Sequence, residues 1–320
     1  MSGSFEGTTP VREAHRFDTD RLANYVRQNV EDFAGPLEVA QFKGGQSNPT
    51  YLIRAGGKSY VMRRKPPGEL LPSAHAVDRE YRVITALAAT DVPVPKTYAL
   101  CTDESVIGTM FFIMDYVEGR IFGDPALPGM TPAERAAIFD ETNRVISALH
   151  RVDYATIGLE DYGKPGSYFA RQISRWTKQY RASETETIRA MDNLIDWLPQ
   201  HIPADDETRI VHGDFRIDNV IFHPREPRAL AVLDWELSTL GHPMSDFAYH
   251  CMMWRMSSGE FHGLADTDVK SLGIPSEKEY LAAYCRRVER EPVPEHEWEY
   301  YMAFNMFRLA AILQGVLARA

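Results

Sequence analysis

The sequence predicts an α+β protein in which a small antiparallel-sheet lobe is followed by a larger, mostly helical lobe. Two patterns predict this order. Short strand-like runs crowd the first 117 residues, and apolar residues recur at helical spacing from residue 131 onward. Between these regions, residues 118–129 hold three glycines and two prolines, which is typical of a linker. We therefore expect an N-terminal lobe over residues 1–117 and a C-terminal lobe over residues 118–320.

The elements of the N-terminal lobe follow from local patterns. Residues 18–33 have apolar side chains at helical spacing, and Asp18 or Asp20 is a candidate helix cap. The pair Gly56-Gly57 predicts a tight hairpin, although Gly56-Gly57-Lys58-Ser59 also ends like a phosphate-binding loop; Leu52 stands where that motif needs its first glycine. A helix is expected at 73–90, and strands are expected at 37–43, 50–54, 59–64, 97–102 and 109–117.

The C-terminal lobe is predicted to be helical with a short β region in its middle. Thr131-Pro132-Ala133-Glu134 combines a capping box with proline at the first helical position, so a helix should run from there to about Val152. Further helices are expected at 166–182, at 186–199, from about Ser245, and from 276 to the end, with short strands within 209–234.

Composition argues against several classes of function. The chain has 320 residues, of which 44% are hydrophobic and 25% charged, and its formal net charge is −10. Nucleic-acid-binding proteins usually present a basic face, so we expect no nucleic-acid partner. No apolar run approaches the roughly 18 residues that a membrane span needs, so we expect no membrane partner. A polar N-terminus and three scattered cysteines are typical of a cytoplasmic protein, and the sequence does not indicate an oligomeric state.

Three polar residues at the ends of apolar runs carry the sharpest chemical signal. Asp214 and Asn219 lie in the loop that follows Arg209-Ile-Val, and Asp234 ends the run Leu230-Ala-Val-Leu233. Phosphoryl transfer from ATP needs one carboxylate beside the acceptor hydroxyl, and one carboxylate with an amide oxygen for Mg²⁺. We therefore expect ATP and Mg²⁺ as cofactors, Asp214 as a catalytic residue, and Asn219 and Asp234 as metal ligands. A turn-forming or helix-capping role is the ordinary alternative.

The spacing of these residues resembles the kinase catalytic loop H-R-D-x-x-x-x-N followed by an Asp, with Gly213 in the arginine position. His212-Gly213-Asp214, Leu233-Asp234-Trp235-Glu236 and the run from Gly241 to Ala248 are similar to the aminoglycoside phosphotransferase and choline kinase-like family. The likeness covers about residues 36–318. It implies a protein-kinase-like bilobal fold, with a nucleotide-binding N-terminal lobe and a catalytic, substrate-binding C-terminal lobe.

The resemblance also implies where the nucleotide binds. Arg63 takes the place of the strand-three lysine of kinases and should pair with Glu80, with Arg64 and Lys65 as alternatives; strand alternation puts Arg63 and Arg64 on opposite faces. A surface charge run is the ordinary alternative for all three cations. Phosphate and adenine contacts would come from Gly44, Gly45, Ser47 and Asn48, and from Asp115, Tyr116 and Val117, although these segments also suit a hairpin loop and ordinary core.

Two residues near the catalytic loop have competing interpretations. Arg216 matches the kinase position whose cation reaches the γ-phosphate, so we expect a catalytic electrostatic role; a simple ion pair with Asp218 is the alternative. Asp246 is at least as suited to capping a helix and bracing the catalytic loop as to binding a ligand, and it is left out of the expected site.

The expected activity is phosphorylation of a small hydroxylated molecule. Only eleven residues separate Asp234 from Asp246, too few for the activation loop of a protein kinase. The acceptor is expected among helices after residue 131, where the residues Tyr154, Tyr162, Tyr168, Arg171, Arg175, Trp176 and Tyr180 gather, although aromatic residues at this spacing are more often core. Aminoglycoside sites are strongly acidic, whereas this segment mixes cations with aromatics.

Acceptor identity rests on a further resemblance. Arg63 to Gly68 and Leu70 to His75 are similar to kinase-like domains fused to acyl-CoA dehydrogenases, which implies a hydroxyacyl or hydroxyacyl-CoA acceptor. A catalytically inactive nucleotide-binding module and a kinase for aminoglycoside-like or amino-alcohol acceptors are the alternatives. A hydrolase is disfavoured because the chain lacks a nucleophile elbow and a histidine cluster.

Overall fold

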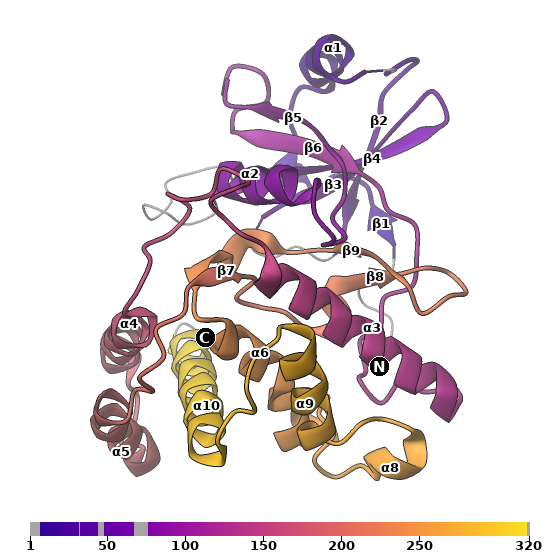
Figure 1. Cartoon of the computed structure of the whole chain (residues 1–320). Coiled ribbons are helices and arrows are strands. Elements are labelled where there is room, and N and C mark those ends of the chain that lie inside the picture. Colours follow the sequence, from indigo (N-terminus) through magenta and orange to yellow (C-terminus); the bar gives the residue numbers. More distant parts are fainter. Residues whose placement is uncertain (1–6, 32, 44–47, 67–75, 319–320) are drawn as a thin grey trace. The chain divides into compact units, whose positions relative to one another are not determined.

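The computed structural model describes residues 7–31, 33–43, 48–66 and 76–318 (Figure 1). The chain forms two compact units. The first contains Met1–Arg120 and Ile221–Glu236, and the second contains Ile121–Val220 and Leu237–Ala320. Residues 221–236 therefore belong with the sheet-containing unit, although the sequence analysis placed the whole of 118–320 in the helical lobe.

The first unit is built on a six-stranded sheet in which every neighbouring pair is antiparallel. Gly56 and Gly57 connect two central strands, with φ of +57° and +79°, which is the left-handed conformation that a two-residue hairpin turn requires. The predicted hairpin is confirmed. The sheet runs in the order β1 (Thr8–Thr9), β2 (Glu38–Phe42), β3 (Thr50–Ala55), β4 (Lys58–Arg64), β6 (Phe111–Asp115) and β5 (Thr97–Cys101).

The two faces of this sheet have different helical neighbours. Helix α1 (Thr19–Asn29), capped by Asp18, packs Leu22 and Val26 into the cluster that contains Met62. Helix α2 (Val77–Leu87) contacts β5 and β6, as in the edge-on ring contact of Tyr81 with Phe112. Because side chains alternate along a strand, Arg63 and Met62 lie on opposite faces.

The second segment of the first unit, residues 221–236, contributes to a two-stranded sheet formed by β8 (Val220–Phe222) and β9 (Ala229–Val232). The backbone of this sheet is hydrogen-bonded to the end of segment 1–120, because Arg120 and Phe222 exchange N–H···O bonds of 2.7 and 2.8 Å. Val232 also donates to the carbonyl oxygen of Pro93 at 2.8 Å. These bonds attach Asp234, two residues after β9, to the sheet-containing unit.

The second unit is mainly helical, and its core is aromatic. Phe247 stacks on Tyr284 with ring centroids 3.9 Å apart, and Tyr162, Tyr168, Trp176 and Tyr180 are buried, so these four of the expected acceptor-region aromatics are core. Its helices are α3 (Pro132–Arg151), α4 (Tyr168–Ser183), α5 (Arg189–Trp197), α6 (Pro243–Cys251), α7 (Ser258–Phe261), α8 (Val269–Leu272), α9 (Glu277–Arg287) and α10 (Glu295–Leu317).

Most predicted helix positions in this unit are confirmed, with two corrections. The predicted capping box of Thr131 and Glu134 opens α3. The helix expected from 276 to the end is two helices, because Pro292 and Pro294 cannot continue α9. The sequence analysis also missed β10 (Thr239–Gly241), which pairs antiparallel with β7 (Arg209–Val211); three residues are too few to show a period.

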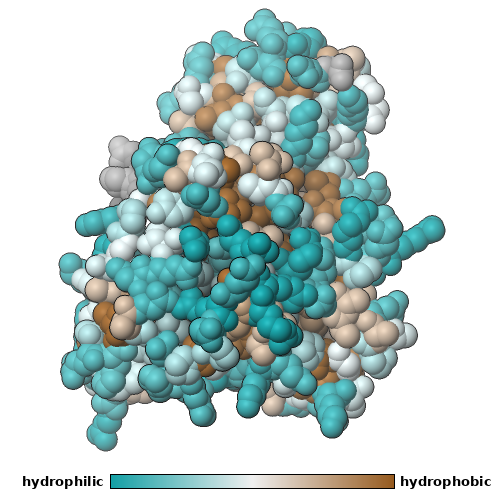
Figure 2. Space-filling view, in the orientation of Figure 1, coloured by the Kyte–Doolittle hydropathy of each residue, from teal (hydrophilic) through white to brown (hydrophobic). Residues whose placement is uncertain are grey.

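The surface is largely hydrophilic on the face that Figure 2 draws. Figure 2 shows one face on which hydrophilic residues predominate and hydrophobic residues form separate patches. Among the described residues, no helix has the length and apolar character needed to cross a membrane.

Candidate active site

A buried arginine organises the polar residues of the first unit. Arg63 Nη1 lies 2.8 Å from Glu80 Oε1, and Arg63 Nη2 lies 3.2 Å from Asp234 Oδ1. Glu236 Oε2 is 3.8 Å from the same Nη2. The expected Arg63–Glu80 pair is therefore confirmed, and Asp234 joins it.

This cluster carries more negative than positive charge. Burial raises the pKa of Glu80 to about 7; Arg63 opposes that shift, and Asp234 and Glu236 add to it. Burial alone would lower the pKa of Arg63, but the carboxylates outweigh it and the pKa is raised. Three carboxyl groups share one guanidinium, an arrangement that an additional cation would stabilise.

Asp234 has a conformation and an exposure that suit a ligand. Its φ is +65°, the left-handed region that non-glycine residues enter at a cost of about 1–2 kcal/mol. Its side chain is 38% exposed, whereas that of Glu80 is 1% exposed. The indole of the next residue, Trp235, is buried and donates to Val232 at 2.9 Å, which anchors the turn.

Arg64 corrects one expectation of the sequence analysis. Its guanidinium lies over the rings of Phe17 and Tyr51, at 5.2 and 5.6 Å from their centroids, and the residue is 2% exposed. The interpretation as a surface charge is wrong for Arg64. Because side chains alternate between the two faces of β4, the Arg64 side chain points into the core beside α1. Arg64 is a packing residue of the opposite face.

The predicted nucleotide-contact segments are only partly described. Gly44, Gly45 and Ser47 lie outside the described residues, whereas Asn48 is fully buried and donates to Glu236 Oε2 at 3.1 Å. In the expected hinge, the Asp115 carboxylate accepts from the Tyr98 hydroxyl. Tyr116 is exposed and stacks with Phe42, and Val117 is half-buried.

In the second unit, Gly213 explains why the catalytic loop departs from the kinase pattern. Its φ is +84°, and a Cβ at this position would lie 2.7 Å from the carbonyl oxygen of Leu237. Only glycine fits this conformation and this close approach. The arginine of the protein-kinase motif therefore has no room here.

Asp246 braces this loop. Its Oδ2 accepts the backbone N–H of His212 at 2.7 Å, and its Oδ1 accepts that of Gly213 at 2.8 Å. Burial would raise the pKa of this carboxyl, but the interactions with His150, and after them those with His212, outweigh burial and lower it. The bracing interpretation of Asp246 is confirmed.

Asp214 is held by a residue that sequence reasoning missed. The Tyr249 hydroxyl donates to Asp214 Oδ1 at 2.6 Å, and Asn219 Nδ2 donates to the Asp214 carbonyl oxygen at 2.9 Å. Burial, and then the Asp214 charge, raise the pKa of Tyr249, so this phenol stays a donor. Its position one helical turn after Asp246 was the available signal, because residues three apart share a helix face.

Arg216 and Arg308 place two cations near Asp214. Arg216 Nη2 is 2.9 Å from Asp218 Oδ2, the ion pair that the sequence analysis held as the alternative, and Arg216 Nε is 3.5 Å from Asp214 Oδ1. Its catalytic role stays a prediction. Arg308, from α10, donates to the Gly213 carbonyl oxygen at 2.8 Å and lies over the Tyr249 ring; no local pattern marks it.

Known proteins match nearly all of this chain. Acyl-CoA dehydrogenase family member 10 of Mus musculus is 49% identical over 316 residues, which cover 98% of this chain and 29% of that protein. Acyl-CoA dehydrogenase family member 11 of Homo sapiens is 42% identical over 322 residues, which cover 97% of this chain and 40% of that protein. The chain thus spans less than half of the length of these relatives.

Solved structures show the same fold. A Ralstonia eutropha JMP134 protein provisionally named an aminoglycoside phosphotransferase has 61% identity and a TM-score of 0.88, covering 95% of this chain and 90% of that one. A type VIII aminoglycoside-3′-phosphotransferase has 18% identity and a TM-score of 0.60, covering 90% and 98%, and shows the protein-kinase-like fold alone. The model of the phosphotransferase enzyme family matches residues 38–294. The sequence resemblance is confirmed: this chain belongs to the phosphotransferase enzyme family.

Proposed function

We propose that the chain is an ATP- and Mg²⁺-dependent kinase that phosphorylates a hydroxyl group of a small molecule, with a hydroxyacyl-CoA or related hydroxyacyl compound as the acceptor. The observation that carries the proposal is the buried Arg63–Glu80 pair with the more exposed Asp234 as a second partner of Arg63. A guanidinium fixed by a buried carboxylate is a rigid phosphate-binding group.

The donor set suits Mg²⁺. Asp234 would offer a carboxylate to the ion, and Asn219 would offer its amide oxygen, since the Asn219 nitrogen is the atom hydrogen-bonded to the Asp214 carbonyl oxygen. The described residues contain no group of three His, Cys, Asp or Glu side chains that could hold a metal by themselves. Mg²⁺ usually takes one or two carboxylates together with substrate phosphates. When bound, Mg²⁺ would neutralise charge on the transferred phosphoryl group.

In the proposed reaction Asp214 orients the acceptor hydroxyl and accepts its proton as the oxygen–phosphorus bond forms. The bond from the γ-phosphorus to the bridging oxygen breaks, and ADP leaves with that oxygen. Tyr249 holds the Asp214 carboxylate for this step at 2.6 Å. Arg216, 52% exposed at its side chain, would offer a positive charge to the transferred group.

Two observations support an acyl acceptor over an aminoglycoside. The relatives that match nearly the whole chain are named acyl-CoA dehydrogenase family members. Helix α4 contains four cations and no acidic residue, whereas aminoglycosides are polycations that acidic sites attract.

The test is a screen of hydroxylated metabolites, as free acids and as CoA thioesters, for Mg²⁺-dependent ADP release. We expect release with a hydroxyacyl acceptor and gain of one phosphoryl group in its mass spectrum. The matched Asp214→Asn variant should release no acceptor-dependent ADP. A response to aminoglycosides but to no acyl compound would overturn the acceptor class, and no acceptor-dependent release in the whole panel would overturn the kinase proposal.

A further inference from the structure

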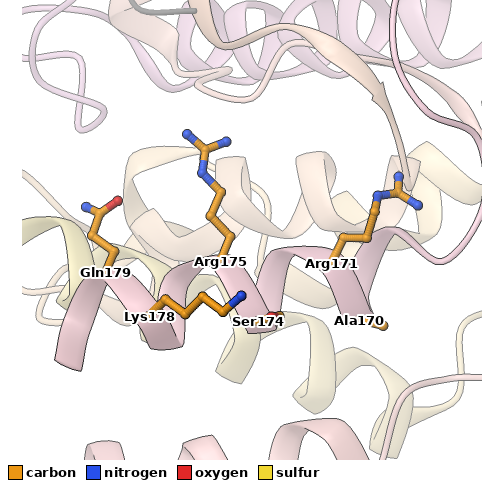
Figure 3. A pocket seen from close by; sticks show the side chains of 6 residues that line it. All are labelled: Ala170, Arg171, Ser174, Arg175, Lys178 and Gln179. Carbon is orange, nitrogen blue, oxygen red and sulfur yellow. The ribbon is translucent and has the colours of Figure 1, made fainter. Parts of the chain in front are cut away.

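Helix α4 presents a cationic surface in an acidic protein. Over Tyr168–Ser183 it has four Arg or Lys residues and no Asp or Glu, while the whole chain has a net charge of −10. A hollow of about 740 Å³ lies on this helix and is lined by Ala170, Arg171, Ser174, Arg175, Lys178 and Gln179. Figure 3 shows Arg171, Arg175 and Gln179 extending from the same side of α4, with Lys178 lying along the helix toward Ser174.

The charges in this hollow are not balanced by carboxylates. Arg171 donates to the carbonyl oxygens of Lys164 and Gly166, which are neutral groups. Arg175 lies over the Trp176 ring, 5.4 Å from its centroid. Within the described ranges no ion pair joins Arg171, Arg175 or Lys178 to an acid, whereas the next cation of the helix, Arg181, pairs with Glu184 and Asp192.

Side-chain contacts within the second unit connect the hollow to the catalytic loop. The Trp176 ring that Arg175 covers is also covered by Arg308, at 5.7 Å. Arg308 continues to the Tyr249 ring at 5.1 Å and to the carbonyl oxygen of Gly213. Tyr249 then holds Asp214. A continuous series of side-chain contacts therefore joins the helix that carries the hollow to the proposed base.

We propose that this hollow binds the phosphate groups of the coenzyme A portion of the acceptor, an inference that rests on the proposed function. Guanidinium groups bind phosphate oxygens through paired N–H donors, and lysine adds a mobile point charge. Ser174 and Gln179 supply neutral donors at the same surface. Coenzyme A carries a diphosphate and a 3′-phosphate, so its charge complements the three cations, whereas the pantetheine arm alone carries none.

The direct test is calorimetric titration of the full chain with coenzyme A, dephospho-coenzyme A and pantetheine. The double variant Arg175→Gln/Lys178→Gln should weaken coenzyme A binding about tenfold or more, the loss expected when charge-assisted hydrogen bonds are removed. The same double variant should weaken the binding of dephospho-coenzyme A by a smaller factor, and pantetheine should bind the variant and the wild type equally. Arg181→Gln is the matched control, because it makes the same kind of charge change on the same helix at a cation already paired.

Kinetics separate this inference from the proposed function. With a hydroxyacyl-CoA substrate, the double variant should raise the acceptor KM and leave kcat and the Mg·ATP affinity unchanged. Charge-dependent coenzyme A binding without any transfer would support the hollow and overturn the proposed kinase. Equal use of a hydroxyacyl-CoA and its pantetheine thioester, or an equal loss of affinity for Mg·ATP in the double variant, would overturn the hollow and leave the kinase standing.

Discussion

At the scale of single residues, two carboxylates of this chain have different surroundings and so different proposed tasks. Asp234 touches a guanidinium and sits at a strained φ of +65°. The Asp214 carboxylate accepts a hydrogen bond from the Tyr249 hydroxyl, and the backbone carbonyl oxygen of Asp214 accepts one from the Asn219 amide. The first environment suits charge binding, and the second suits orientation of a group that exchanges a proton.

Asp234→Ala should abolish Mg²⁺-dependent nucleotide binding, because it removes the exposed carboxylate of the Arg63 cluster. Asp214→Asn should bind Mg·ATP nearly as the wild type does and lose at least about a hundredfold in kcat, the usual contribution of a positioned base. Calorimetry and initial rates measure the two effects. Wild-type Mg·ATP binding by Asp234→Ala would remove this residue from the metal site.

Arg63 and Arg64 provide a matched pair on opposite faces of one strand. Arg63→Ala should raise the ATP KM by about tenfold. Arg63→Lys should raise the ATP KM by a smaller factor, because the positive charge is kept. Arg64→Ala should lower the melting temperature through lost packing on Phe17 and Tyr51, and its folded fraction should keep the wild-type ATP KM. A raised ATP KM for Arg64→Ala at unchanged melting temperature would contradict this assignment.

Tyr249→Phe removes one hydroxyl from Asp214 and keeps the ring that Arg308 covers. We expect kcat to fall about tenfold, as for loss of one hydrogen bond to a charged group, with the ATP KM unchanged. Steady-state kinetics with a thermal melt check the split. An equal rise of both KM values with unaltered kcat would show that Tyr249 does not act through Asp214.

At the scale of elements, the β3–β4 hairpin that carries Arg63 turns on two glycines, Gly56 and Gly57. Both glycines have a positive φ, but they differ in the room that the surrounding atoms leave for an added Cβ. A Cβ on Gly56 would lie 2.5 Å from the carbonyl oxygen of Ala34, whereas nothing lies within 4 Å of a Cβ on Gly57.

Gly57→Ala should therefore cost about 1–2 kcal/mol of unfolding free energy, the penalty for a left-handed alanine. Gly56→Ala should cost clearly more, because the close backbone contact adds to the same penalty. Urea denaturation of the two variants measures the difference. Equal losses would mean that the Ala34 segment yields freely to the added methyl group.

At the scale of the whole molecule, buried ionisable groups set the response to acid. Burial lowers the pKa of His242 and of His250 to about 4, from about 6.5 when exposed. Both therefore stay neutral in the folded chain at pH values where the unfolded chain binds protons. The Asp246 carboxyl, whose pKa is lowered, adds a loss of stability at still lower pH.

The free energy of unfolding should consequently fall as the pH decreases from about 6.5 to about 4, by up to about 3 kcal/mol for each histidine. Urea unfolding at several pH values measures the slope. His242→Asn should flatten it, because asparagine also caps a helix but does not titrate in this range. A wild-type stability that is constant between pH 7 and 5 would contradict the buried neutral histidines.

Local sequence determined much of the proposed chemistry of this protein. Asp214, Asn219 and Asp234 were found because each follows or precedes a short apolar strand at a spacing that is read without tertiary information. The opposite faces of Arg63 and Arg64 followed from the two-residue period of a strand, whereas the pairing of Arg63 with Glu80 was implied by the resemblance to kinases. The proposed roles of these residues stay predictions.

Tertiary structure alone decided the supporting residues. Arg64 is buried because α1 covers one face of the sheet, Arg308 reaches the Gly213 carbonyl across 95 positions, and Tyr249 reaches the Asp214 carboxylate from α6. Segment 221–236 likewise joins the first unit through backbone bonds to Arg120 and Pro93. Such contacts depend on which surfaces pack together over long sequence separations, and no local period encodes that choice.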